Sequence, residues 1–250
     1  MKLFGQKCST KFSVFIRQQE SELGLRIVFS KMERHHIDHY YEDLLGTYEL
    51  DDKQNILKVY VNVALIKNKC IHPDSKEVTA AHEVLHVWAC RAGFPITKRP
   101  PEFPDDGPEA FVGSKIHSMV QHVAIDSKLQ GHGFDPLIVQ QEKGRDAIRR
   151  WESMDFTVLR KGSPKFVLET LDYMEGQLRY PAEIRNAAKT ILSARNHALF
   201  SLGEQGLARI RESDCLQPDG ALVALIKVRD LLELKPHGVL VFDPRDGRVY

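Results

Sequence analysis

The chain has 250 residues, and 42% of them are hydrophobic, which is enough for a sizeable apolar core. Its 35 Lys and Arg residues nearly balance 34 Asp and Glu residues, so the formal net charge is +1. Nucleic-acid-binding proteins usually carry a basic excess, so this balance does not favour nucleic acid as a partner. No apolar run is long enough to span a membrane, and the N-terminal sequence lacks the apolar stretch of a secretory signal. Four scattered cysteines without a CxxC pair predict reduced thiols and a cytoplasmic location.

The first third of the chain predicts a mixture of helix and strand. The segment from Ser13 to Gly46 predicts a helix or strand, followed by a helix from His35 to Leu45. The clearest strand is Ile56–Ile66, in which apolar and other residues alternate. This strand is either an ordinary core strand or an edge strand that pairs with an extended peptide.

A helix is predicted next, over residues 72–94. Asp74 or Ser75 can cap its start, Glu77 places negative charge in its first turn, and Gly93 can end it. Five prolines between Pro95 and Pro108 then predict an ordered loop, which either borders a cleft or simply connects two helices. A second helix is predicted from Glu109 to Gln130.

From Leu137 onward the patterns are mostly helical. Gly and Pro residues separate successive helical segments, and residues 238–250 predict a strand, a turn and a short partner strand. The sequence therefore predicts an α+β protein. Residues 1–135 would form one lobe with a small mixed sheet, and residues 136–250 a mostly helical lobe, although one continuous domain is equally compatible with the patterns.

The helix over residues 72–94 carries the most specific chemical pattern, HEVLH. His82 and His86 are four residues apart, so both imidazoles lie on one face of the helix and can bind one metal ion. Glu83 lies about 100° further round and can contact a water molecule at that ion. Two zinc ligands and a general base is the chemistry of the H-E-x-x-H pattern.

The residues around this pattern strengthen the metal interpretation. Apart from Glu83, no charged residue lies between Val78 and Cys90. The stretch TAAHEVLHVW, Thr79–Trp88, resembles the signature of the zincin metallopeptidases. The resemblance covers roughly residues 57–133 and implies a zincin lobe in which a later helix supplies the third zinc ligand.

The third ligand is predicted on the helix Glu109–Gln130. In the thermolysin-like zincins it is a Glu, followed four residues later by an Asp that orients a zinc-binding His. Here His122 precedes Asp126 by four residues, so His122 is predicted as the ligand and Asp126 as the residue that orients His82 or His86. The alternatives for the third ligand are Glu109, His117 and His132.

Other residues remain as weaker candidates. Three histidines near the N-terminus could bind a metal or lie on a solvated helix face: His35, His36 and His39. Cys90 could approach the same metal or simply pack. A donor to a tetrahedral oxyanion could come from Tyr173, Tyr180 or His197, and the sequence does not choose among them.

The resemblance implies a zinc metallopeptidase, a hydrolase that acts on a protein or peptide substrate. Zn²⁺ would be held by His82, His86 and His122, with Glu83 as general base. The balanced charge and the absence of a secretion signal favour an enzyme dedicated to one intracellular protein target. The alternative is a non-enzymatic, zinc-stabilised regulatory or interaction protein.

Overall fold

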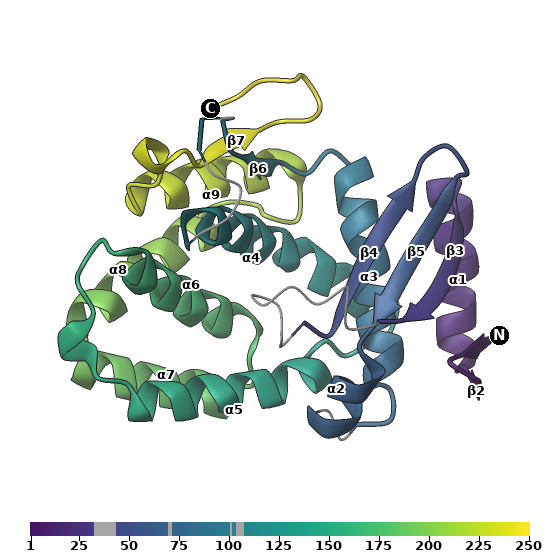
Figure 1. Cartoon of the computed structure of the whole chain (residues 1–250), viewed down its shortest axis with the longest axis horizontal. Coiled ribbons are helices and arrows are strands. Elements are labelled where there is room, and N and C mark those ends of the chain that lie inside the picture. Colours follow the sequence, from purple (N-terminus) through teal and green to yellow (C-terminus); the bar gives the residue numbers. More distant parts are fainter. Residues whose placement is uncertain (33–43, 70–71, 101, 104–107) are drawn as a thin grey trace. The chain divides into compact units, whose positions relative to one another are not determined.

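The computed structural model describes residues 1–32, 44–69, 72–100, 102–103 and 108–250. It has the predicted α+β class, with small sheets near the N-terminus and a mostly helical C-terminal region (Figure 1). The cluster His35, His36 and His39 lies outside the described residues. The same holds for the predicted helix from His35 to Leu45, except for its last two residues.

The chain forms two compact units, and each is discontinuous in sequence. The first contains Met1–Arg91 and Ile125–Glu142, and the second contains Ala92–Ala124 and Lys143–Tyr250. One long helix, α4 (Pro108–Gly131), contributes residues to both units. The boundary predicted near residue 135 stays a prediction.

The first unit is built on a three-stranded mixed sheet in the order β3-β5-β4. β3 (Arg26–Lys31) runs parallel to β5 (Ile56–Val61), and β4 (Gly46–Asp51) runs antiparallel to it. A small hairpin, β1 (Lys2–Leu3) and β2 (Gln6–Lys7), precedes the sheet. The predicted alternation is confirmed along β5, because its apolar residues on one face have no exposed surface: Leu57, Val59 and Val61.

The predicted strand Ile56–Ile66 is confirmed in its first half and wrong in its second half. β5 ends at Val61, and the helix α2 (Val63–Lys69) follows. The side chain of Asn62 causes this change, because its Oδ1 accepts a hydrogen bond from the backbone N of Leu65 at 3.0 Å and so caps α2. Of the two alternatives for this strand, the core strand is confirmed, because β5 is the central strand of the sheet and β4 is an edge strand.

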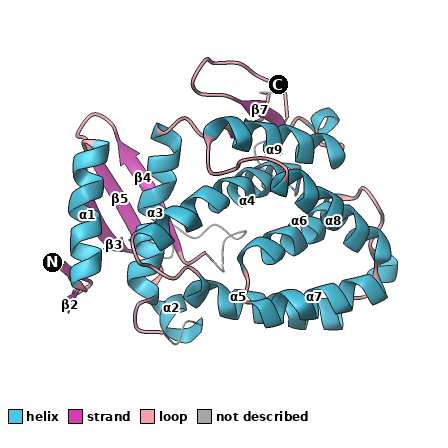
Figure 2. Ribbon diagram, turned by 180° about the vertical axis from the view of Figure 1, so that it is seen from behind, coloured by secondary structure: helices cyan, strands magenta, loops and turns pink. Residues whose placement is uncertain are grey.

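Two helices pack side by side against this sheet, α1 (Thr10–Leu23) and α3 (Ser75–Arg91) (Figures 1 and 2). Ser9 caps α1, and its Oγ also donates to Glu77 of α3 at 2.6 Å. The helix predicted over residues 72–94 is confirmed as α3, and Gly93 follows its end with a φ of 81°. A positive φ is unstrained for glycine, so Gly93 permits the turn away from α3.

The second unit is mostly helical. Four helices in its C-terminal part pack in sequence: α6 (Pro164–Arg179), α7 (Ala182–Arg195), α8 (His197–Arg211) and α9 (Pro218–Leu231). α5 (Leu137–Ser153) precedes them, and short 3-10 turns lie at Phe156–Val158 and Lys235–His237. Asn196 separates α7 from α8, because its side chain accepts a hydrogen bond from the backbone N of Leu199 and starts a new helix.

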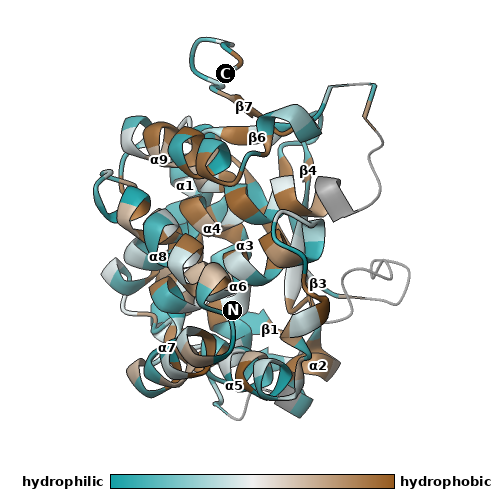
Figure 3. Cartoon of the chain, turned by 90° about the vertical axis from the view of Figure 1, so that its left-hand side faces the viewer, coloured by the Kyte–Doolittle hydropathy of each residue, from teal (hydrophilic) through white to brown (hydrophobic). Residues whose placement is uncertain are grey.

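Close helix packing and a small sheet complete this unit. A Cβ at Gly203 would come within 2.5 Å of Tyr173, so the glycine lets α8 approach α6. β6 (Ile96–Lys98) pairs antiparallel with β7 (Leu240–Phe242), and Phe242 also bridges to Val249, which confirms the predicted C-terminal hairpin. Figure 3 shows hydrophobic residues interleaved with hydrophilic ones along α4 and α9. Within the described part of the chain, no helix is both long and apolar enough to cross a membrane.

Candidate metal centre

The middle of helix α3, from Ala80 to Val87, carries three polar side chains among apolar ones. Its neighbouring residues are almost completely buried: Val78, Ala80, Ala81, Val84 and Leu85. Burial of these residues fixes the rotation of the helix about its axis, and therefore fixes where His82, Glu83 and His86 point. Imidazole and carboxylate groups are costly to hold beside such a core unless they have partners.

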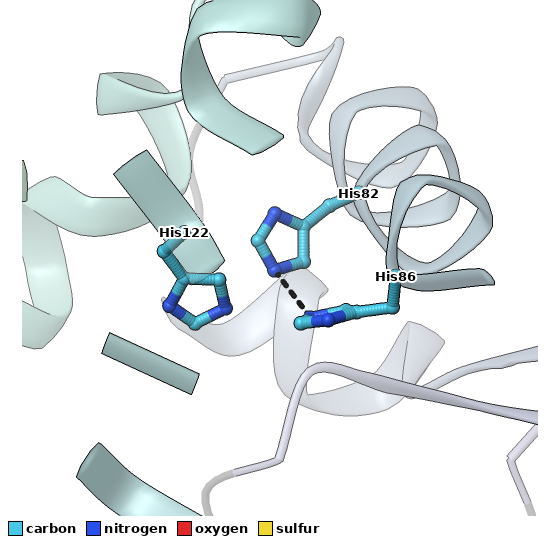
Figure 4. A group of neighbouring side chains, drawn as sticks. All are labelled: His82, His86 and His122. Carbon is cyan, nitrogen blue, oxygen red and sulfur yellow. Dashed lines mark hydrogen bonds between the residues drawn. The ribbon is translucent and has the colours of Figure 1, made fainter. Parts of the chain in front are cut away.

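The two histidines of α3 converge. Their Nε2 atoms lie 3.2 Å apart, and the rings meet edge to face with centroids 4.8 Å apart (Figure 4). Two nitrogens bound to one tetrahedral zinc ion at the usual bond length would be about 3.3 Å apart. The spacing of His82 and His86 therefore already fits two ligands of a single ion.

Asp126 lies behind His82, on the side away from His86. One of its carboxylate oxygens is 3.9 Å from Nδ1 of His82, while Nε2 of His82 faces His86. This end of α4 is held in the first unit by Lys128, whose Nζ lies 3.1 Å from Glu22 and 4.3 Å from the ring centre of Trp88. A small approach of Asp126 would let it accept a hydrogen bond from Nδ1–H of His82 and leave Nε2 as the ligand atom.

His122 precedes Asp126 by one turn of the same continuous helix. Its ligand nitrogen and those of His82 and His86 all lie within 4.8 Å of one another (Figure 4). Among the described residues, these three histidines form the group that could hold a metal ion. Three imidazoles suit zinc, copper, iron or nickel, so the donor set fits a transition metal without naming it.

His122 also has partners on α6. Nη1 of Arg179 lies 2.7 Å from Nδ1 of His122 and donates to Glu175 at 3.1 Å. A guanidinium group only donates, so Nδ1 of His122 accepts, and the ring proton is on Nε2. A metal bound at Nε2 would need that proton on Nδ1, and Nη1 of Arg179 would then have to give up its contact with Nδ1 while keeping its bond to Glu175.

Glu83 is 8% exposed and lies against the edge strand β4. A Cβ built at Gly46 would lie 2.8 Å from Cγ of Glu83 and 3.0 Å from its Oε1. Any larger residue at position 46 would push the carboxylate aside, so the absence of a side chain on Gly46 makes room for Glu83.

Tyr48, two residues after Gly46 on β4, contacts His86, the last residue of HEVLH. Its ring stacks on that of His86 with centroids 6.1 Å apart and an interplanar angle of 19°. Burial raises the pKa of the Tyr48 hydroxyl, and its hydrogen bond with Cys90 and the charge of Glu83 raise it further. Tyr48 therefore stays protonated and holds the His86 ring in place. Cys90 lies with Tyr48 and is not part of the three-histidine group.

The alternative third ligands His132 and His117 are not part of the three-histidine group. The imidazole of His132 packs edge-on against Phe15, with ring centres 5.0 Å apart. His117 lines a separate pocket in the second unit, and the side chain of Glu109 is outside the described part of the structure.

The three candidate oxyanion donors belong to the second unit: Tyr173 lies on α6, Tyr180 follows the end of α6, and His197 begins α8. The hydroxyl of Tyr173 donates to Glu204 at 2.5 Å. Tyr180 is buried, and its ring packs close to Gly144 and Gly176. His197 is exposed and contacts Phe200.

Three residues at the centre were not predicted: Gly46, Tyr48 and Arg179. Their signals are weak, since a single glycine, tyrosine or arginine has no spacing that points to HEVLH. No protein-family model matches the chain, and neither curated proteins nor solved structures give a significant match. The centre therefore has to be interpreted from its own residues.

Proposed function

We propose that the protein is a zinc-dependent hydrolase of the zincin type that cleaves peptide bonds in a protein or peptide substrate. The observation that supports this most strongly is the pair of Nε2 atoms 3.2 Å apart on a helix that also carries Glu83. In a structural zinc site, four protein ligands fill the coordination sphere and no base is needed. A catalytic zinc site has three protein ligands and an open position for water or substrate. Three histidines with an adjacent carboxylate match the catalytic pattern better.

Each residue has a defined role in this proposal. Zinc held by His82, His86 and His122 would lower the pKa of water and polarise the scissile carbonyl. Glu83 accepts a proton from the attacking water and delivers it to the leaving nitrogen. Asp126 accepts a hydrogen bond from Nδ1–H of His82 and thereby orients that ligand. We further propose that the enzyme cleaves one specific protein target.

Metal content of the purified protein tests the centre directly. We expect about one zinc per chain. The variants His82→Ala, His86→Ala and His122→Ala should each lose most of it, because three ligands share the ion. His197→Ala is the matched control, since His197 is exposed and outside the group. Retention of zinc in His122→Ala would remove that residue from the ligand set, and a metal-free wild type after reconstitution would refute the centre.

Removal of the metal separates the enzyme from a zinc-stabilised interaction protein. In the proposed enzyme, the sheet and α3 are held by their own core, so a chelator should abolish hydrolysis and leave the fold intact. In a structural zinc protein, metal binding and folding are coupled, and a chelator would unfold the chain. Circular dichroism before and after chelation distinguishes the two results.

Gly46→Ala is expected to lower hydrolysis by about tenfold to a hundredfold without loss of zinc. The added methyl group would displace the Glu83 carboxylate, and a misplacement near 1 Å is enough for such a loss. Gly131→Ala is the control, because a Cβ there meets no atom within 4 Å. The ratio of peptidase activity to bound zinc is the measurement. Unchanged activity per zinc in Gly46→Ala would contradict the position assigned to Glu83.

A further inference from the structure

A second concave site lies within the second unit, apart from HEVLH. It is a pocket of about 250 Å³, here called the basic pocket, lined by Thr97, Lys98, Arg99, Gly113, Ser114, His117 and Val239. Thr97 and Lys98 of β6 and the adjacent Arg99 form one wall of the pocket. The first half of α4 forms another, and Val239, just before β7, completes the lining. The Thr97 hydroxyl donates to the backbone oxygen of Gly113 at 2.9 Å and joins the first two walls.

The pocket is positively charged. Lys98 and Arg99 both line it, and the described lining contains no Asp or Glu to neutralise them. The ammonium group of Lys98 lies 3.2 Å from the centre of the Phe242 ring, a contact that holds the cation without cancelling its charge. A concave surface with this charge attracts anions.

Several buried donors of the pocket have no hydrogen-bond partner. Nε and Nη1 of Arg99 are both buried and unbonded, and together they carry three N–H groups. Nε2 of His117 is likewise buried and unbonded. Native proteins rarely leave such groups without a partner, because a buried unsatisfied donor is costly. These atoms can therefore bind an acceptor that enters the pocket.

The chemistry of the lining residues indicates which kind of acceptor fits the pocket. Arg99 and Lys98 can only donate, and the Ser114 hydroxyl can donate as well. Burial lowers the pKa of His117 to about 4, so at neutral pH its imidazole is uncharged, and in the tautomer with the proton on Nε2 it donates into the pocket. Donors from a strand end and from a helix approach from different directions, which suits a tetrahedral anion with several oxygens better than a planar carboxylate.

We propose that the basic pocket binds a phosphate group, either as free phosphate or as the monoester of a small molecule. Arg99 supplies the main charge-assisted hydrogen bonds, Lys98 adds a second positive charge, and Ser114 and His117 complete the contacts from α4. The binding residues are distinct from His82, His86 and His122, and this site does not depend on the proposed peptidase activity.

Calorimetric titration of the full-length protein with inorganic phosphate tests the site. Wild type should bind at micromolar to millimolar concentrations, and Arg99→Gln should weaken binding about tenfold or more. Arg160→Gln removes the same charge from an exposed position outside the pocket and should have no effect. Should Arg99→Gln fail to fold, Lys98→Gln is the second variant, since Lys98 is exposed.

Phosphate bound at the metal centre must be distinguished from phosphate bound in the basic pocket. His82→Ala should retain phosphate binding, because it alters only the metal centre. Loss of binding in His82→Ala together with normal binding in Arg99→Gln would place the anion at the metal and overturn the proposal, as would no binding by wild type. Phenyl phosphate binding more tightly than inorganic phosphate would identify an ester as the ligand, and the reverse order would identify free phosphate. Acetate binding as tightly as either would contradict the phosphate assignment.

Discussion

Replacement of Glu83 by Gln is expected to lower peptide hydrolysis by about 10²- to 10⁴-fold while the zinc content stays the same. Glutamine has nearly the same shape, so it fits beside Gly46 as Glu83 does, but its amide cannot take a proton from water. Neither His82 nor His86 changes, so the metal ligands are preserved. Activity and zinc content should be measured on the same preparation.

Glu77→Gln is the matched control for this result. Glu77 lies on the same helix and accepts two hydrogen bonds from Ser9, at 2.7 Å from its backbone N and at 2.6 Å from its hydroxyl. Its loss should affect stability and leave activity per zinc unchanged. If Glu83→Gln retained full activity, Glu83 would not be the base. If it lost the metal, Glu83 would be a ligand instead.

Glu175→Ala is expected to destabilise the protein by about 3–5 kcal/mol. Glu175 is 4% exposed and accepts hydrogen bonds from Lys115 at 2.8 Å, Lys143 at 3.2 Å and Arg179 at 3.1 Å. Burial alone would raise the pKa of this carboxyl, but the three positive charges hold it well below its ordinary value. The substitution leaves those cations without their shared anion.

Urea unfolding measures this loss, with Glu212→Ala as the control. Glu212 pairs with Arg209 at 3.6 Å, and both side chains are more than half exposed, so its removal should change stability by less than about 1 kcal/mol. An equally small change in Glu175→Ala would show that solvent reaches the cluster and screens its charges.

The local parts of the centre could be predicted from the sequence. Spacing of four residues on a helix determines that His82 and His86 share a face, and the same rule places His122 one turn from Asp126. The structure brings the three histidines within 4.8 Å, which requires only that two predicted helices approach each other. The zinc identity and the catalytic role of Glu83 remain predictions.

The parts that depend on distant pairing could not be predicted. Gly46 and Tyr48 reach α3 through the register of β4 on β5, which no local spacing reveals. Arg179 meets His122 across 57 residues of sequence. The second half of the predicted strand failed for another reason. Val63–Ile66 is a short apolar run that is compatible with strand or helix. The hydrogen bond from the backbone N of Leu65 to the Asn62 side chain caps a helix there.

The pairing of β6 with β7 constrains the order in which the second unit can form during synthesis. Ile96 pairs with Phe242, so β6 leaves the ribosome long before its partner strand exists. Closing so long a loop is slow, because the entropy cost precedes any gain from the contact. β6 must therefore wait for its partner strand, and the basic pocket, which is lined by residues of β6 and by Val239 next to β7, can be completed only after β7 has paired with β6.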